Sequence, residues 1–185
     1  MLLLVICWLL YFFIHSALAS LWLKEKVRSY FPGMFSYYRI IYNIIAILGL
    51  LPLLAWSISK PVNMEIPFHQ ILGGLISLIG LYFMRKAFQS FDMAEFLGLK
   101  SEGNAILVTK GMYGYVRHPL YFASILLIGG LFLLFPSQTM LLVMLISYAY
   151  IIIGSKLEER KLRKHFGQAY MDYAKQVKAL IPYVY

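Results

Sequence analysis

The chain has 185 residues, of which 61% are hydrophobic, 17% aromatic and only 14% charged. Soluble domains are nearer half apolar and a quarter charged, so this composition excludes an ordinary soluble protein and predicts a single membrane-embedded domain over residues 1–185. The formal net charge of +9 comes from cationic residues in short segments between apolar runs, a pattern that is typical of membrane proteins and requires no nucleic-acid partner.

Five apolar runs predict an all-α integral membrane protein with five transmembrane helices. A helix rises about 1.5 Å per residue and the hydrocarbon layer is about 30 Å thick, so even the shortest runs can span a thin or tilted path. The first run contains Ala17-Leu18-Ala19, which resembles a signal-peptide cleavage site, but no Lys or Arg precedes it, so we interpret it as a retained helix. The predicted helices are residues 1–23, 37–59, 68–84, 119–135 and 139–154.

The segments between the first four helices are predicted to lie at the membrane surface. Residues 24–36 form a basic connector with a turn at Pro32-Gly33. Residues 85–118 are polar but keep several large apolar side chains, so we expect them to fold against the membrane face. In the third helix, three glycines predict a close approach to a neighbouring helix: Gly73, Gly74 and Gly80.

The last two helices and the tail form the carboxyl-terminal part of the predicted fold. Only Pro136-Ser137-Gln138 separates the two helices, so they are predicted to form a hairpin. In residues 155–185, apolar side chains recur every three or four positions. This period predicts a cytoplasmic amphipathic helix at the interface, interrupted at Gly167.

The positions of Lys and Arg predict the orientation in the membrane. The first connector with Arg39, residues 85–118 and the tail hold four, five and seven of the 17 Lys and Arg residues, and only Lys60 lies in a loop on the opposite side. By the positive-inside rule, the amino terminus lies outside and the carboxyl terminus lies in the cytoplasm.

The most unusual stretch is Gly111–Tyr121, which combines two glycines and three tyrosines with Arg117, His118 and Pro119 directly before an apolar run. The acidic pair Glu158-Glu159 follows the last apolar run. Because a hairpin brings the ends of its two helices together, these clusters are predicted to be neighbours at the cytoplasmic face. Pro119 suits the first turn of a helix, where its missing N–H is not needed.

Each residue of these clusters also has a purely structural interpretation. Glu159 and Arg163 are spaced as an ordinary i,i+4 ion pair. Arg117 has the position of a side chain that reaches toward lipid headgroups, and tyrosines at the interface form aromatic belts. The combination favours a binding site over these separate explanations.

The carboxyl-terminal part resembles the isoprenylcysteine carboxyl methyltransferase family and its relatives among membrane methyltransferases. The resemblance covers about 75 residues and lies in a set of short motifs rather than in any one of them. These motifs are Gly111, Tyr113, Arg117-His118-Pro119-Leu120-Tyr121, Glu158-Glu159, Leu162, Phe166-Gly167, Tyr170, Tyr173 and Ile181-Pro182.

The resemblance implies a methyltransferase that uses S-adenosylmethionine and binds it from the cytosol. It implies no metal site. It implies catalytic roles for Arg117 and Arg163, whose side chains would face the carboxylate of the donor or the acceptor. Donor binding falls to Tyr113, Tyr115, His118, Pro119, Tyr121, Glu158 and Glu159.

The amino-terminal part resembles the NnrU-type and methanethiol S-methyltransferase branch at residues 15–20, 38–43 and 92–99. This resemblance implies a prokaryotic inner membrane and a small thiol or another lipophilic acceptor, such as a prenylcysteine or a carboxylate. Polar residues inside a membrane need a partner or a function, so the candidate acceptor residues are His15, Arg39, Tyr42 and Asn43. Their depths argue against all four meeting at one point, and helix packing is an alternative role for His15.

Two other classes of function remain open. A membrane reductase that uses NAD(P)H, like the sterol reductases, has a related carboxyl-terminal architecture. A non-catalytic membrane protein that binds lipid is the other alternative. A soluble methyltransferase fold is excluded, because the chain has no glycine-rich strand-to-helix fingerprint.

Overall fold

The computed structural model describes residues 1–58, 67–90 and 106–184. These residues form two compact units: residues 1–58 belong to the first unit, and residues 67–90 and 106–184 belong to the second. The described residues are helical and contain no strand, only an isolated bridge between Val116 and Lys178. The all-α prediction is therefore confirmed for this part of the chain, whereas Lys60 and the motif at residues 92–99 lie outside it.

Four helical segments are long and apolar enough to cross a membrane, which confirms an integral membrane protein. They are Leu2–Ala19, Pro32–Ile58, Phe68–Phe88 and Gln138–Phe166. A further helix, α6 (Pro119–Leu134), is apolar but has only 16 residues. At 1.5 Å per residue it is about 24 Å long, which is short for a span perpendicular to the bilayer.

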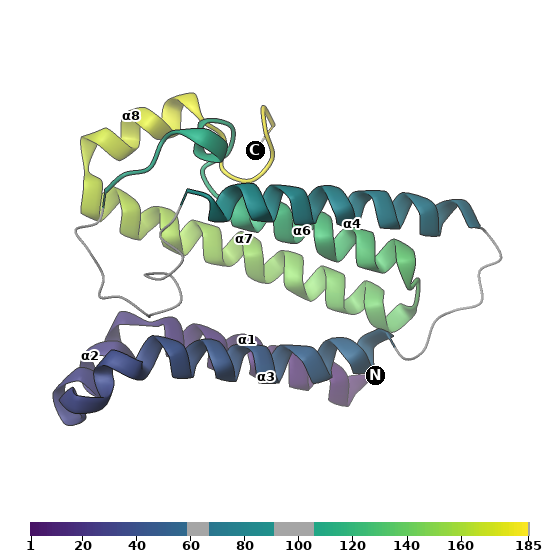
Figure 1. Cartoon of the computed structure of the whole chain (residues 1–185), viewed down its shortest axis with the longest axis horizontal. Coiled ribbons are helices and arrows are strands. Elements are labelled where there is room, and N and C mark those ends of the chain that lie inside the picture. Colours follow the sequence, from purple (N-terminus) through teal and green to yellow (C-terminus); the bar gives the residue numbers. More distant parts are fainter. Residues whose placement is uncertain (59–66, 91–105, 185) are drawn as a thin grey trace. The chain divides into compact units, whose positions relative to one another are not determined.

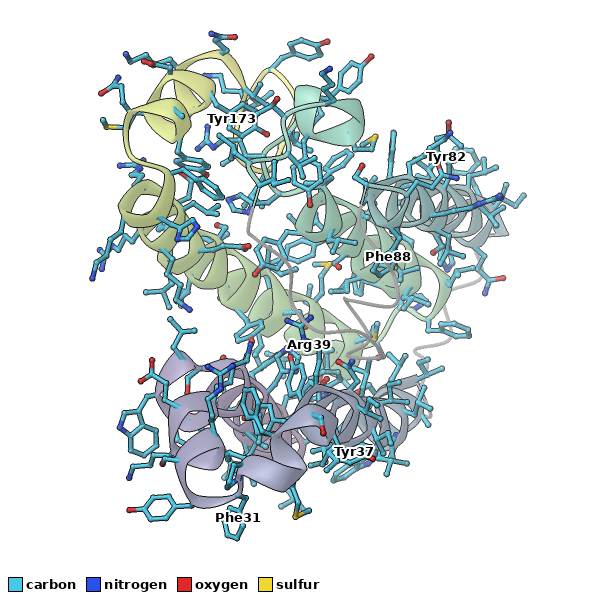
Figure 2. All side chains as sticks on the ribbon, turned by 60° about the vertical axis from the view of Figure 1, so that its left-hand side comes forward. Phe31, Tyr37, Arg39, Tyr82, Phe88 and Tyr173 are labelled. Atoms are coloured by element: carbon cyan, nitrogen blue, oxygen red, sulfur yellow. The ribbon has the colours of Figure 1, made fainter. Side chains whose placement is uncertain are left out.

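The first unit departs from the predicted boundaries at Ser20. Helix α1 ends at Ala19 instead of residue 23, because Ser20 is extended and its hydroxyl caps a new helix by accepting from the Leu23 N–H at 3.3 Å. The predicted connector is thus helix α2 (Leu21–Tyr30) followed by a 3-10 helix, η1 (Pro32–Tyr37). Phe31, between the two, projects away from the unit (Figure 2).

Helix α3 (Tyr38–Ile58) packs along α1, and polar side chains join the two helices. The Trp8 indole donates to the Ser57 hydroxyl at 3.1 Å, and both residues are almost completely buried. At the other end, the Tyr38 hydroxyl donates to the Leu18 carbonyl at 2.6 Å. In hydrocarbon these polar groups have no water to bind, so such bonds hold the two helices in register.

In the second unit, α4 (Pro67–Phe88), α6 and α7 (Gln138–Phe166) lie side by side (Figure 1). A methyl group on Gly73 would lie 2.7 Å from the Gly130 carbonyl oxygen, and one on Gly80 would lie 2.9 Å from the Leu127 nitrogen. The predicted close approach is therefore confirmed at Gly73 and Gly80. It is wrong for Gly74, where the nearest atom lies 4.0 Å away.

Helix α7 is longer than predicted and continues past Gly154 to Phe166. No proline or glycine follows Gly154 until Gly167, whose φ of +56° ends the helix, and α8 (Gln168–Gln176) begins there. The predicted interruption at Gly167 is correct, but the predicted helix end at residue 154 is wrong. A helix of 29 residues is about 43 Å long, so its charged final turns extend beyond a hydrocarbon layer of about 30 Å.

Candidate functional site

The site lies in the second unit, where the chain enters α6 and leaves α7, and α8 with the segment after it contacts both places. The Arg117 N–H donates to the Lys178 carbonyl at 2.8 Å, and the His118 N–H donates to the Ala179 carbonyl at 3.0 Å. These bonds fix the entrance of α6 against the tail. Pro119 occupies the first turn of α6 and is buried, as its sequence position predicts.

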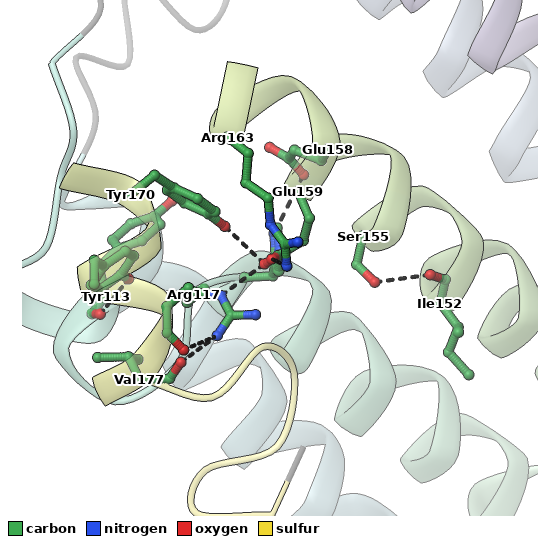
Figure 3. Close-up of polar contacts among 12 residues, drawn as sticks. Tyr113, Arg117, Ile152, Ser155, Glu158, Glu159, Arg163, Tyr170 and Val177 are labelled. Carbon is green, nitrogen blue, oxygen red and sulfur yellow. Dashed lines mark hydrogen bonds and ion pairs between the residues drawn. The ribbon is translucent and has the colours of Figure 1, made fainter. Parts of the chain in front are cut away.

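Glu159 is the centre of the site. Its Oε1 atom accepts from Arg117 Nε at 2.7 Å, from the Tyr170 hydroxyl at 2.8 Å and from His118 Nε2 at 2.9 Å (Figure 3). Because a carboxylate oxygen only accepts, His118 must carry its proton on Nε2 in this contact. Three donors converge on one oxygen, and they stabilise the ionised form of a residue that is only 8% exposed.

The other oxygen of Glu159 is bonded quite differently. Within the described part of the chain, Oε2 is buried and has no hydrogen-bond partner. Its nearest charge is Arg163 Nη2 at 3.5 Å, and the Arg163 side chain is 59% exposed. Buried polar atoms are usually paired, so Oε2 is an acceptor available to a donor from outside the described residues.

Glu158 has a more open position beside the same histidine. Its Oε2 lies 3.4 Å from His118 Nδ1, and its side chain is 46% exposed. The Tyr121 side chain also interacts with this carboxylate, and its ring stacks on His118 at a centroid distance of 5.5 Å. Each ring nitrogen of His118 therefore faces a different carboxylate, Nδ1 that of Glu158 and Nε2 that of Glu159.

Arg117 also binds the end of α8. Its Nη1 atom donates to the carbonyls of Ala174, at 3.0 Å, and Val177 (Figure 3). The last carbonyls of a helix lack partners within the helix and attract a cation, so Arg117 caps α8 while it pairs with Glu159. Burial acts to lower the pKa of Arg117, but the hydrogen bond and the charge of Glu159 outweigh it, and the net shift is upward.

The tyrosines of α8 complete the packing. Tyr170 is fully buried, and burial together with the adjacent Glu159 raises its pKa. The Tyr173 hydroxyl donates to the Tyr113 carbonyl at 2.6 Å, and burial raises the pKa of Tyr173 to about 12. Both phenols therefore stay protonated near neutral pH and act as donors.

The other two predicted tyrosines lie in different environments. Tyr113 is partly buried, and burial and the charge of Glu158 raise its pKa. This places its side chain within the electrostatic reach of the site. The Tyr115 side chain is 60% exposed, and the structure does not bring it into the cluster around Glu159.

The four predicted acceptor residues belong to the first unit. The Tyr42 hydroxyl lies 3.0 Å from His15 Nε2, and the two rings are 5.2 Å apart. Arg39 and Asn43 are partly buried and stand one turn apart on the same side of α3 as Tyr42. The contact between His15 and Tyr42 links α1 to α3.

Tyr170 and Tyr173 are residues of the candidate site to which the sequence reasoning assigned no role. Both belong to the motif that carries the resemblance, and their three-residue spacing places them on one side of α8. That spacing was the available signal. Their contacts with Glu159 and with the Tyr113 carbonyl depend on how α8 packs after the turn at Gly167. No spacing rule specifies this packing.

Comparison with known proteins points to one family. A sequence profile described as "Phospholipid methyltransferase" matches residues 68–169. Methanethiol S-methyltransferase of Pseudomonas sp. (strain GM41(2012)) is 28% identical over 182 residues, which cover 91% of this chain and 68% of that protein. The same-named protein of Crocosphaera subtropica is 32% identical over 60% of this chain and 40% of its own length.

Protein-S-isoprenylcysteine O-methyltransferase of Schizosaccharomyces pombe is 33% identical over 102 residues, or 55% of this chain and 42% of the relative. The matched part of this chain thus spans less than half of the Crocosphaera and Schizosaccharomyces relatives.

Proposed function

Because this chain belongs to the phospholipid methyltransferase family, we propose that it is a membrane methyltransferase that uses S-adenosylmethionine and methylates a small or lipophilic thiol or carboxylate. The observation that carries the proposal is the pairing of Glu159, whose Oε1 atom accepts three hydrogen bonds while its buried Oε2 atom accepts none within the described residues. Such an atom suits a ligand that brings hydroxyl or ammonium donors.

The chain's own residues fit this donor by charge and by hydrogen bonding. Glu159 Oε2 and the half-exposed Glu158 carboxylate would accept from its ribose hydroxyls or its ammonium group. When bound, S-adenosylmethionine would supply an electrophilic methyl group to an aligned thiolate or carboxylate by in-line displacement, in which the sulfonium carbon–sulfur bond breaks and S-adenosylhomocysteine leaves. The protein then has to align the two reactants and exclude water, and neither task requires a soluble domain.

The two arginines are assigned different tasks. Arg117 is held by Glu159 and by two carbonyls of the α8 end, so we assign it the role of a positioning residue that keeps Glu159 and α8 together. Arg163 is exposed and lies 3.5 Å from Glu159 Oε2. It remains the candidate for contact with the carboxylate of the donor or with the acceptor.

For the acceptor we favour a small thiol over a prenylated one. The Pseudomonas methanethiol S-methyltransferase aligns with 91% of this chain, whereas the isoprenylcysteine relative aligns with 55%. An alignment over 91% of this chain has to include most of the first unit, to which the proposed acceptor residues His15, Arg39, Tyr42 and Asn43 belong.

In the proposed topology, α6 is the fourth of five spans and forms a hairpin with α7, and the site is cytoplasmic. Only three residues separate the two helices, which pack against each other. Single cysteines at positions 110 and 60 would test this in intact cells with an impermeant maleimide. We expect labelling at position 60 only, and labelling at position 110 would reverse the orientation.

The proposed cofactor is tested by calorimetric titration of the purified full chain with S-adenosylmethionine, S-adenosylhomocysteine and NADPH. We expect both sulfur compounds to bind and NADPH not to bind. Binding of NADPH alone would support the reductase alternative, and binding of none of the three would support a non-catalytic protein.

Two variants locate the binding site. A hydrogen bond to a charged group contributes about 1.5–3 kcal/mol, so Glu159→Gln or Glu158→Gln should weaken donor binding about 10–100-fold. Glu158 is half exposed, so its variant tests binding with little risk to folding. Asp172→Asn, which changes an exposed carboxylate paired with Lys175, is the matched control. Unchanged affinity in both glutamine variants would place the pocket elsewhere.

A further inference from the structure

The exposed face of α7 changes from apolar to basic where the helix leaves the apolar segment. Leu145 and Ile152 are 53% and 40% exposed on this face. Leu145 and Ile152 are two helical turns apart, and Lys156, Arg160 and Lys164, all exposed, follow Ile152 at intervals of four residues. Residues four apart lie on one side of a helix, so one continuous stripe is apolar along the span and cationic beyond it.

The depths of Lys156 and Arg160 are close to that of the lipid headgroups, whereas Lys164 starts beyond them and has to reach back with its side chain. The apolar part of α7 ends at Gly154, so Lys156 follows it by about 3 Å, Arg160 by about 9 Å and Lys164 by about 15 Å. The headgroup region adds roughly 5–8 Å on each side of the hydrocarbon. Helical side chains lean toward the amino-terminal end of their helix, which here is toward the bilayer, and long basic side chains can reach back to it.

The nearby acidic residues do not neutralise this stripe. Glu159 lies on the buried side of α7 and is paired with Arg117, and Glu158 faces His118. No ion pair involves Lys156, Arg160 or Lys164 within the described part of the chain. Three like charges on one exposed face repel each other and favour an anionic partner.

We propose that Lys156, Arg160 and Lys164 bind the phosphate groups of anionic phospholipids and so set the depth of α7 in the membrane. The continuity with the apolar stripe selects lipid over a soluble partner, because a ligand at this place has to meet acyl chains and cations on the same face. This contact is separate from the proposed methyl transfer, since none of the three side chains takes part in the cluster around Glu159.

The test measures lipid selectivity of the full chain in phosphatidylcholine vesicles that contain trace spin-labelled phosphatidylglycerol or spin-labelled phosphatidylcholine. Electron paramagnetic resonance gives the association constant of each labelled lipid with the protein. We expect the wild type to prefer phosphatidylglycerol. The triple variant Lys156→Gln/Arg160→Gln/Lys164→Gln should lower this preference at least about fivefold, because one basic residue near an anionic membrane surface contributes about 1 kcal/mol. Added salt should weaken the wild-type preference.

A charge-preserving variant separates lipid binding from a folding defect. Lys156→Arg/Arg160→Lys/Lys164→Arg changes the same three positions but keeps every charge, so its preference should stay near the wild-type value. The proposal is overturned if wild type associates equally with both lipids, or if the glutamine variant keeps the wild-type preference.

Discussion

Two groups of polar side chains can be compared: neutral pairs between α1 and α3 in the first unit, and the charged cluster around Glu159 in the second. Between α1 and α3, Trp8 binds Ser57 and Tyr42 binds His15, one donor to one acceptor. Around Glu159, by contrast, four side chains share two carboxylate oxygens. The first arrangement joins two helices, whereas the second joins α6, α7 and α8.

The two regions should therefore lose different amounts of stability when one polar partner is substituted. A neutral pair inside hydrocarbon loses little when one partner changes, because the remaining group can find another partner in the membrane. A buried ion that loses its counterion keeps its charge without compensation, which is strongly destabilising.

Arg117→Ala should be the most damaging single change. It leaves Glu159 buried without its main counterion and removes the cap of α8, so we expect a loss of about 3–5 kcal/mol in stability. Thermal unfolding in detergent would measure it. Arg163→Ala, which removes an exposed partner of the same carboxylate, is the control, and equal effects of the two variants would contradict the central role of Arg117.

Tyr170→Phe should have the next largest effect. It removes one of three donors to Glu159 Oε1 while it keeps the ring, so a bond to a charged group worth about 1.5–3 kcal/mol is lost. The same unfolding measurement applies, with Tyr183→Phe at an 85% exposed tyrosine as the matched control. A wild-type transition for Tyr170→Phe would mean that the other two donors are sufficient.

Glycine substitutions test whether the units also differ in packing. A methyl group on Gly73 meets the backbone of α6, whereas one on Gly49 of α3 meets only the Tyr11 ring, and that ring can move. Overpacking costs about 1–3 kcal/mol, so Gly73→Ala should destabilise clearly and Gly49→Ala should destabilise less. Gly74→Ala, next to the first site but with its nearest atom 4.0 Å away in ordinary van der Waals contact, is the control. An equal loss at positions 73 and 74 would refute the contact with α6.

Tyr42→Phe should have the smallest effect on stability. Hydrogen bonds between membrane helices average about 0.6 kcal/mol, so a marginal change in thermal unfolding is expected. If His15 and Tyr42 bind the acceptor, the same variant should raise KM for a small thiol without changing the affinity for the methyl donor. Wild-type kinetics for Tyr42→Phe and His15→Ala would assign the pair to helix packing.

Much of the local organisation was predictable from the sequence. The amino acid composition predicted a helical membrane protein, and the motifs from Gly111 to Pro182 predicted its resemblance to membrane methyltransferases; the structure and the comparisons confirm both. Most errors concern helix ends: α1 stops early at a serine cap, α4 continues to Phe88 and α7 runs past Gly154, whereas the error at Gly74 concerns packing. Hydropathy marks where a segment ceases to be apolar, whereas a helix ends where its backbone hydrogen bonds are capped or interrupted.

The sequence alone therefore predicts the features that depend on neighbouring residues. These are the apolar runs, the proline at the start of α6, the turn at Gly167 and the family motifs. Only the tertiary structure decided which atoms of those motifs meet. Residues 117 and 159 stand 42 positions apart, and 117 and 177 stand 60 apart, so their contacts depend on how α6, α7 and α8 pack. No spacing rule could predict that three donors converge on one oxygen of Glu159, because each hydrogen bond requires a distance of about 3 Å that tertiary packing sets.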